Sequence, residues 1–289
     1  MRATGRATTD PAAQDKSKPT NRRYPVKTWL SLAGGAVLAL SAANASAQDM
    51  LRIGTEGAYP PWNYTEANGE LAGFEVDLGN AMCEKMNVTC EFVAQDWDGI
   101  IPALMNGRYD AIMAGMSITD ERRERISFST GYVTDPAYFL APKSSPLQDA
   151  ETLDQVKAAI DGMTVGVQGS TIHQNFIDEY LAGMVDLKLY DTQENMELDL
   201  TAGRIDAALA DYAAWRAFFE KSDGAEFDIF GPKLTGSDYP VFGEGVGVGL
   251  RQEDDELLEK INAALAALKE DGTITVLSNQ YFGYDITMF

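Results

Sequence analysis

Cysteine and histidine are scarce in this chain: its 289 residues include two cysteines and one histidine. Two thiols and a single histidine far away at His173 make a poor zinc site. Basic residues are also few, with 23 Lys+Arg against 44 Asp+Glu and a formal net charge of -21. This balance argues against nucleic acid and anionic membrane as partners. It permits a cationic small ligand without establishing one.

A long apolar run is missing as well. The longest candidate, "WLSLAGGAVLAL", is too short for a membrane span, and it lies between the basic residues Arg22, Arg23 and Lys27 and the small residues of "ANASA". This is the pattern of a secretory signal, so we expect residues 1–47 to be a signal peptide cleaved before Gln48. The residue directly after the cleavage point is Gln48 and not a cysteine, so we expect a mature protein that is soluble outside the cytoplasm and has no lipid anchor. Residues 48–289 hold 16 Lys+Arg and 42 Asp+Glu, a net charge of -26.

The two cysteines, Cys83 and Cys90, both belong to the predicted mature chain. An even count in an oxidising compartment favours one disulfide, and metal binding is the alternative. Leu78 and Met82 have helical spacing before Cys83, whereas Val88, Cys90 and Phe92 alternate as in a strand. A helix end and the adjoining strand are close enough to pair, so we predict the disulfide.

Short apolar strands alternate with helix-length segments through the rest of the mature chain, which implies a largely parallel sheet covered by helices. An internal repeat divides it: "LMNGRYDAIMA" from Leu104 and "LTAGRIDAALA" from Leu200 share six of eleven positions. In each copy we expect a helix to end at a glycine, Gly107 or Gly203, and a strand to start one or two residues later. One interpretation is that all helix–strand junctions look alike. The other is two similar lobes whose strand ends face a shared cleft, where ligands of open α/β sheets bind.

Two extended segments are candidates for crossing between the lobes, "YVTDPAYFLAP" near residue 136 and "YPVFGEGVGVGL" near residue 242. Two such passages would form a hinge. We therefore predict a first lobe of residues 48–136 plus 243–289 and a second lobe of residues 137–242. A final amphipathic helix, with Ile261, Leu265 and Leu268 on one stripe, should cover the sheet before Gly272.

The segment "DAIMAGMSITDERRERISFS" places arginines directly after an apolar strand. Thr119 fits as a helix N-cap, which puts Arg122 in the first turn, where a cation meets the positive end of the helix. Arg123 and Arg125 are explained as solvated partners of nearby acids. Arg122 is explained by a ligand carboxylate, because a guanidinium presents two parallel donors to two carboxylate oxygens. Backbone N–H groups near Gly115 and Ser117, and a helix start at Ser170 or Thr171, would add donors.

Together these segments resemble the polar amino-acid family of periplasmic solute-binding proteins of ABC importers. The resemblance spans Gln48 to Phe289 and is greatest to the branch that binds lysine/arginine/ornithine, histidine and opines, whose members have a cysteine pair at the same spacing. It implies a two-lobed (type II) α/β fold, each lobe a mainly parallel sheet flanked by helices, joined by two hinge strands. The motifs that carry it are "IGTEGAYPPW", "GELAGFEVDL", "DAIMAGMSITDERRERISFS", "VGVQGST", "LTAGRIDAALAD", "VGLRQEDDELLEKINAAL" and "DGTI".

The resemblance also implies a ligand site. Arg122 would clamp the α-carboxylate with help from Ser117 and Thr171, and Asp211 would accept the α-ammonium. The distal end of the ligand would lie between Tyr59 and Trp97 with Glu56 at its tip. Ala114 and Gly115 stand where histidine and lysine binders commonly have serines, so two hydroxyl contacts are lost. The complete predicted ligand set is Glu56, Tyr59, Trp97, Ala114, Gly115, Ser117, Arg122, Gly169, Thr171 and Asp211.

Each assignment has a structural alternative. Trp97 and Tyr59 can be packing residues and Glu56 a solvated strand end. Asp211 is harder to explain this way, because a carboxylate that ends an apolar strand is costly to bury unless it is paired. An aromatic face with a carboxylate suits a guanidino or amino group. We expect His173, beyond the capping residues, on the helix surface.

We therefore predict a periplasmic, monomeric binding protein that closes on a cationic amino acid (arginine, lysine or ornithine type) and delivers it to an ABC permease of the inner membrane. Opine binding (octopine or nopaline) is the alternative ligand, and a cyclohexadienyl dehydratase-like enzyme, with Glu56 as the candidate acid, is the alternative class. A sensor that presents the ligand to a membrane receptor would use the same pocket. We expect no catalytic residue, no cofactor, no metal and no nucleic-acid partner.

Overall fold

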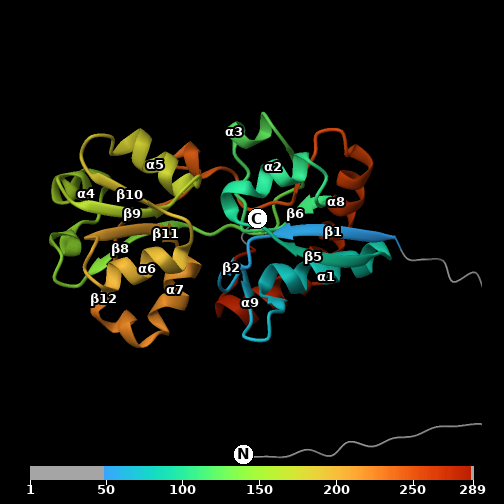
Figure 1. The fold of residues 1–289 in the computed structure, drawn as a ribbon, viewed down its shortest axis with the longest axis horizontal. Coiled ribbons are helices and arrows are strands. Elements are labelled where there is room, and N and C mark those ends of the chain that lie inside the picture. The colour runs from blue at the N-terminus through green and yellow to red at the C-terminus, as the bar shows by residue number, and fades with distance from the viewer. Residues whose placement is uncertain (1–48, 288–289) are drawn as a thin grey trace, which may run out of the picture. The chain divides into compact units, whose positions relative to one another are not determined.

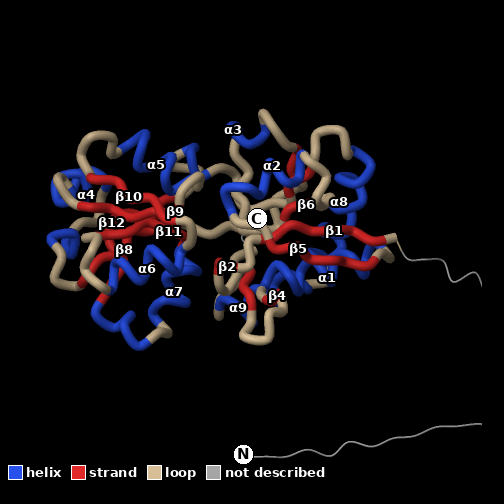
Figure 2. Tube along the Cα trace, in the orientation of Figure 1, coloured by secondary structure: helices blue, strands red, loops and turns tan. Residues whose placement is uncertain are grey.

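Residues 49–287 are described by the computed structural model, and they contain two five-stranded sheets and one small three-stranded sheet. Helices lie on both faces of each five-stranded sheet (Figures 1 and 2). The α/β two-lobed architecture predicted from the sequence is confirmed. We call the part built on the first sheet the first lobe and the part built on the second sheet the second lobe.

The first sheet has the strand order β5-β1-β6-β13-β7. Strand β1 is parallel to both β5 and β6, whereas β13 is antiparallel to β6 and β7. Strands β1 and β6 are mostly buried because helices cover both faces of the sheet, whereas the edge strand β5 has no buried residue. The strands are β1 (Met50–Thr55), β5 (Thr89–Ala94), β6 (Ala111–Ile112), β7 (Ser127–Phe128) and β13 (Gly249–Leu250).

The second sheet repeats this topology in the order β10-β9-β11-β8-β12. Strand β9 is parallel to β10 and β11, and β8 is antiparallel to β11 and β12. In each sheet four strands thus run in one direction, and one strand, β13 or β8, runs against them. The strands are β8 (Ala137–Pro142), β9 (Thr164–Gln168), β10 (Asp186–Tyr190), β11 (Ala207–Asp211) and β12 (Phe227–Leu234).

The small sheet follows β1 and consists of β2 (Ala58–Tyr59), β3 (Asn63–Thr65) and β4 (Leu71–Ala72). The helices of the first lobe are α1 (Phe74–Met86), α2 (Ile100–Met105), α3 (Asp120–Arg123), α8 (Asp255–Glu270) and α9 (Thr273–Phe282). Those of the second lobe are α4 (Leu153–Ile160), α5 (Ile172–Tyr180), α6 (Gln193–Thr201) and α7 (Tyr212–Phe219). The predicted final amphipathic helix is α8, whose apolar stripe is buried.

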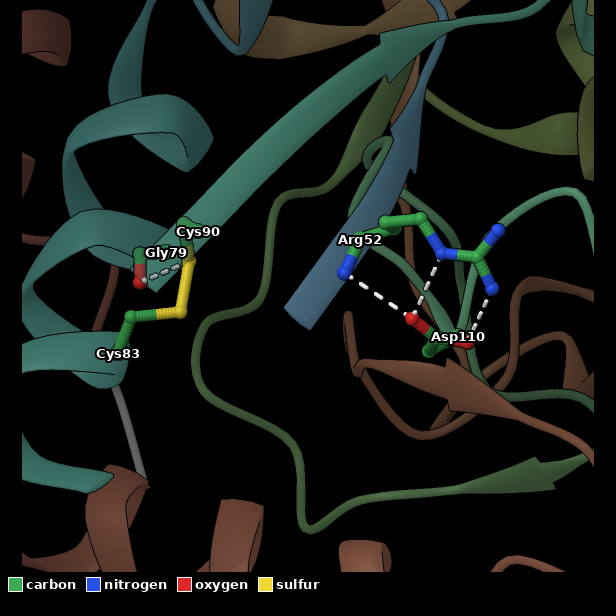
Figure 3. The surroundings of a disulfide bond; sticks show 5 residues. All are labelled: Arg52, Gly79, Cys83, Cys90 and Asp110. Carbon is green, nitrogen blue, oxygen red and sulfur yellow. Dashed lines mark hydrogen bonds and ion pairs between the residues drawn. A yellow bond between two sulfur atoms is a disulfide. The ribbon is translucent and has the colours of Figure 1, made fainter. Parts of the chain in front are cut away.

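The predicted disulfide joins Cys83 of α1 to Cys90 of β5 (Figure 3). Helix α1 ends at Asn87, which adopts a left-handed conformation with φ 56° and turns the chain back toward β5. This short return brings the two Cα atoms to 5.9 Å. The prediction of a disulfide is confirmed, and the metal alternative for these cysteines is excluded.

The sequence repeat has a physical basis in both lobes. Helices α2 and α6 end before Gly107 and Gly203, which have φ values of 72° and 65°. Tyr109 and Ile205, at the same position of the repeat, pack against glycines of the neighbouring strands. A Cβ at Gly54 would lie 2.4 Å from the Tyr109 ring, and one at Gly166 would lie 2.5 Å from Ile205.

The aspartate of the repeat also has one role in both lobes. Asp110 accepts the backbone N–H of Arg52 at 3.1 Å, and Asp206 accepts that of Thr164 at 2.8 Å. Asp110 also binds the Arg52 side chain at 2.7 Å (Figure 3). Strands β6 and β11 therefore begin four residues after the glycine. Our expectation of one or two residues was wrong, because the intervening residues lock the junction onto the adjacent strand.

The chain passes between the sheets twice, after β7 and again between β12 and β13. Val133 and Val246 of these two segments form a β-bridge, so the crossings lie side by side. The exact lobe boundaries at residues 136 and 242 stay a prediction. No helix among residues 49–287 is long and apolar enough to cross a membrane. The predicted signal peptide lies outside the described residues.

Candidate functional site

A cavity of about 430 Å³, a volume that includes its opening to solvent, is lined by residues of both lobes at the carboxyl ends of strands. Every residue of the predicted ligand set except Gly169 lines it. Gly169 lies between two lining residues, and its N–H is bonded to Tyr190. Five further residues that the sequence reasoning missed complete the wall: Gln168, Ile172, His173, Gln193 and Leu209. The ligand-binding role of the whole set remains a prediction.

Arg122 is the arginine of "DERRER" that faces the cavity. Its Nη1 donates to the Ser117 carbonyl at 2.9 Å, and its guanidinium lies 5.2 Å from the centroid of the Trp97 ring. Among residues 49–287 it forms no ion pair, and burial lowers its pKa to about 10. Arg123 instead pairs with Glu244 at 2.7 Å, and Arg125 is exposed. A partly buried guanidinium with spare donors is therefore available to a ligand anion.

Short capping interactions position Arg122 and the start of α5. Thr119 accepts the Arg122 N–H at 3.3 Å, which confirms the predicted N-cap, although α3 has only four residues. Thr171 caps α5 by accepting the Gln174 N–H at 3.3 Å, and its hydroxyl donates to the Gln168 carbonyl at 2.7 Å. The Thr171 hydroxyl is thus used within the protein.

Gly115 corrects one expectation. Its N–H donates to the Glu75 carboxylate at 2.7 and 2.9 Å, so it is not a spare donor. Glu75 is fully buried and also accepts from Asn63 at 2.8 Å and from the Tyr132 hydroxyl. Burial raises the pKa of Glu75. A buried carboxylate needs such donors, and satisfying it fixes this wall of the cavity. Glu75 precedes Leu78 and Met82 on the buried face of α1, a spacing that could have indicated its burial.

Asp211, at the end of β11, is held from both lobes. The Tyr59 hydroxyl, from the first lobe, donates to Oδ2 at 2.8 Å, and His173 Nε2 lies 3.1 Å from Oδ1. Burial and the Asp211 charge raise the pKa of Tyr59 well above its ordinary value. The expectation that His173 lies on the helix surface was wrong: it is only 5% exposed. The reason is that its face of α5 packs against Phe242 of the second crossing segment.

Glu56 follows β1 and is 9% exposed. Its Oε1 accepts from Gln168 Nε2 at 2.6 Å, and it forms no ion pair among the described residues. Burial raises its pKa to about 7, against the opposing effect of the Gln168 hydrogen bond. The interpretation of Glu56 as a solvated strand end is therefore excluded. Three charged groups therefore line the cavity: Arg122 and Glu56, which form no ion pair among the described residues, and Asp211, which contacts His173.

Four hydrogen bonds join the two lobes around the cavity. Two of them, from Tyr59 to Asp211 and from Gln168 to Glu56, are described above. In the third, Trp97 Nε1 donates to the Ser170 carbonyl at 3.0 Å, and in the fourth, Asn175 donates to Glu121 at 2.8 Å. Ser170 is in the left-handed region with φ 58°, between β9 and α5. The four pairs are Tyr59–Asp211, Gln168–Glu56, Trp97–Ser170 and Asn175–Glu121.

The missed residues differ in how visible they are in the sequence. Gln168 ends strand β9, so the rule that ligands sit at strand ends could have identified it. Gln193 is 3% exposed and donates to Glu197 at 3.1 Å, but after a helix N-cap it reads as a solvated residue. Ile172 and Leu209 have apolar side chains, so nothing in the sequence distinguishes them from core residues.

The comparisons with known proteins agree with this architecture. The profile of the bacterial extracellular solute-binding proteins, family 3, matches residues 51–284. The octopine-binding periplasmic protein of Rhizobium meliloti is 39% identical over 87% of this chain and 97% of its own length. The L-arginine-binding protein of Pseudomonas aeruginosa is 40% identical over 89% of this chain and 97% of its own length.

A solved structure shows the same fold. A periplasmic His/Glu/Gln/Arg/opine family-binding protein from Silicibacter pomeroyi, in complex with lysine, has a TM-score of 0.71 and 37% identity. The match covers 83% of this chain and all of that one. These relatives are named as binding proteins. By profile, identity, coverage and fold, the chain belongs to the bacterial extracellular solute-binding proteins, family 3.

Proposed function

We propose that this chain is the periplasmic substrate-binding component of an ABC importer and that it captures a cationic amino acid of the arginine, lysine or ornithine type. The observation that carries the proposal is the partly buried Arg122 and the buried Glu56 on the wall of one cavity, neither of which forms an ion pair among the described residues. An amino acid with a cationic side chain supplies a carboxylate for the first and a cation for the second.

Binding to both lobes explains capture by closure. Arg122, Glu56 and Tyr59 belong to the first lobe, whereas Asp211 and Gln168 belong to the second. A ligand that contacts both sets stabilises the closed arrangement more than the open one. The hinge then consists of the two crossing segments bridged at Val133 and Val246.

The ligand is oriented by the chemistry at each end. Arg122 offers donors to the α-carboxylate, and Asp211 retains acceptor capacity for the α-ammonium beside its bonds to Tyr59 and His173. Trp97 and Tyr59 supply aromatic walls for the aliphatic part and its cation. An uncharged side chain would leave Glu56 without a counter-ion.

An opine is the second candidate, supported by the 39% identity to the octopine-binding relative. Octopine keeps an arginine-like part but carries a second carboxylate on its amine. In a poorly hydrated cavity that carboxylate is repelled by Asp211. Ala114 and Gly115 bring no polar side chain to this wall, and a Cβ at Gly115 would already contact the Tyr59 ring at 3.6 Å.

In the proposed role the protein acts as a monomer, leaves the ligand chemically unchanged and delivers it to an ABC permease in the inner membrane. A thermal-shift screen of ligand-free protein against amino acids and opines tests it, because a ligand that binds only the folded state raises its stability. We expect the largest shifts with L-arginine, L-lysine or L-ornithine and recovery of the ligand unchanged. Glu56→Gln should remove this preference, whereas Glu91→Gln, an exposed acid on β5, should keep it.

A further inference from the structure

His173 is a buried titratable residue on the cavity wall that none of the roles above uses. Its Nε2 lies 3.1 Å from Asp211 Oδ1, and the side chains of this pair are only 7% and 14% exposed. Tyr59 occupies the other oxygen of the same carboxylate. His173 thus contacts Asp211, the acid proposed to receive the ligand's ammonium. A charge on the imidazole would therefore change which ligand groups Asp211 attracts.

We propose that His173 sets the ligand preference of this cavity with pH: uncharged, it leaves Asp211 to an amino acid's ammonium, and charged, it shifts the preference toward a ligand with a second carboxylate. The proposal rests on the proposed function, because it assumes that the ligand's amine faces Asp211.

The direction follows from electrostatics. An imidazolium 3.1 Å from Asp211 neutralises the carboxylate and donates to it as a charged group. The attraction of Asp211 for an ammonium weakens, and so does its repulsion of a carboxylate. Both effects act in one direction, and both are strong because the pair is shielded from water. Imidazole groups change charge between about pH 5 and about pH 8.

L-Arginine and octopine form the matched ligand pair. Both carry a guanidinium, an α-carboxylate and an amine, and octopine adds a carboxylate on the amine substituent. Titration of Glu56 affects both through the shared guanidinium, so it cancels in the ratio of their affinities. The other charged or titratable groups near His173 are Asp211, Tyr59 and Arg122 on the cavity wall, Asp135 close to Asp211, and Glu121, Asp178 and Tyr239, which contact other residues of α5.

Asp135 is the competitor to exclude, because it lies in the first crossing segment close enough to Asp211 for their charges to interact. Burial and that interaction raise the pKa of Asp135 well above its ordinary value. Asp135→Asn removes this titration and leaves His173 in place. His173→Gln keeps a side-chain amide that can donate to Asp211 but cannot become charged.

The experiment is calorimetric titration of the wild type and both variants with each ligand between about pH 5.5 and about pH 8. We expect the preference for L-arginine over octopine to rise about tenfold with pH in the wild type, the effect of one pKa unit. It should stay constant in His173→Gln and rise as in the wild type in Asp135→Asn. A constant ratio in the wild type, or an equal rise in His173→Gln, would overturn the inference.

A second measurement reads the residue directly. His173 is the only histidine of the chain, so protein purified without a histidine tag gives the Hε1 and Hδ2 signals of one imidazole in proton NMR, and we follow the Hε1 signal. L-Arginine should lower the pH midpoint of that signal and octopine should raise it. Midpoints unchanged by bound L-arginine would overturn the inference while leaving the proposed function intact. No binding of either ligand at any pH would overturn the proposed function, and this inference with it.

Discussion

Glu56 gives the sharpest quantitative prediction, because its protonation should be coupled to the side-chain charge of the ligand. Burial raises its pKa from 4.5 to about 7. At pH 7 about half of the ligand-free molecules therefore carry a protonated Glu56. A guanidinium placed beside it favours the carboxylate form, so binding of L-arginine should release about half a proton at this pH.

The magnitude follows from the same shift. Ionising Glu56 in the folded, ligand-free protein costs about 3 kcal/mol more than in the unfolded chain. Because the folded-state pKa is raised, protonated Glu56 favours the folded protein below about pH 4.5, and this stabilisation is lost as the pH rises through about 7. A bound cation that returns the pKa of Glu56 to its ordinary value removes the cost of ionisation. Affinity for L-arginine should therefore rise with pH over this range, by up to about 100-fold.

The assay is calorimetry at pH 7 in buffers of different ionisation enthalpy, which yields the number of protons released. L-Citrulline is the matched control, since its side chain has nearly the shape of arginine without the charge. Any proton released by His173 is common to both ligands and cancels in the difference. We expect the difference to be about half a proton in the wild type and zero in Glu56→Gln. Equal release by the two ligands, or a difference that persists in Glu56→Gln, would refute the reasoning.

Three further predictions rest on other contacts. Arg122→Gln should weaken every amino-acid ligand by at least about tenfold, whereas Arg125→Gln, on an exposed side chain, should change affinity little; similar losses would remove Arg122 from the site. Replacing Cys83 and Cys90 by serine should lower the free energy of unfolding by about 2 to 3 kcal/mol, measured by denaturant titration, and an unchanged midpoint would contradict it. Tyr59→Phe removes the hydrogen bond from Tyr59 to Asp211 between the lobes but keeps the aromatic wall, so it should speed release of L-arginine in stopped-flow experiments. A release rate equal to that of the wild type would show that this hydrogen bond does not stabilise the closed arrangement.

The sequence predicted the elements whose signals are local. Helix α1, strand β5 and the disulfide followed from the spacing of Leu78, Met82, Val88 and the cysteines. The repeated "GR-x-DA" pattern correctly predicted two lobes of like topology. Its aspartates hold the neighbouring strand, and its apolar residues fill the space beside Gly54 and Gly166. Such packing is local enough to leave a pattern in the sequence.

The cavity was predictable where a residue had no easy structural explanation. Arg122 in a first helical turn and Asp211 at the end of an apolar strand both pointed to a site, and both line the cavity. The resemblance to a known family supplied most of the other positions.

The misses share a physical cause, which is packing between segments far apart in the chain. His173 looks like a surface residue until Phe242, about seventy positions later, covers its face of α5. Gly115 looks like a free donor until Glu75 takes its N–H. Neither partner is visible in the local pattern, so tertiary structure was needed to identify them.

The central claim is that the cavity selects a cationic amino acid through Arg122 and Glu56, two charged residues on its wall. Calorimetric titration of ligand-free protein with L-arginine, L-citrulline and octopine at neutral pH tests it most directly. The account predicts one L-arginine bound per chain, with an affinity at least about tenfold higher than that of L-citrulline and higher than that of octopine. Binding of L-citrulline as tight as that of L-arginine, or a preference for octopine of tenfold or more, would contradict it.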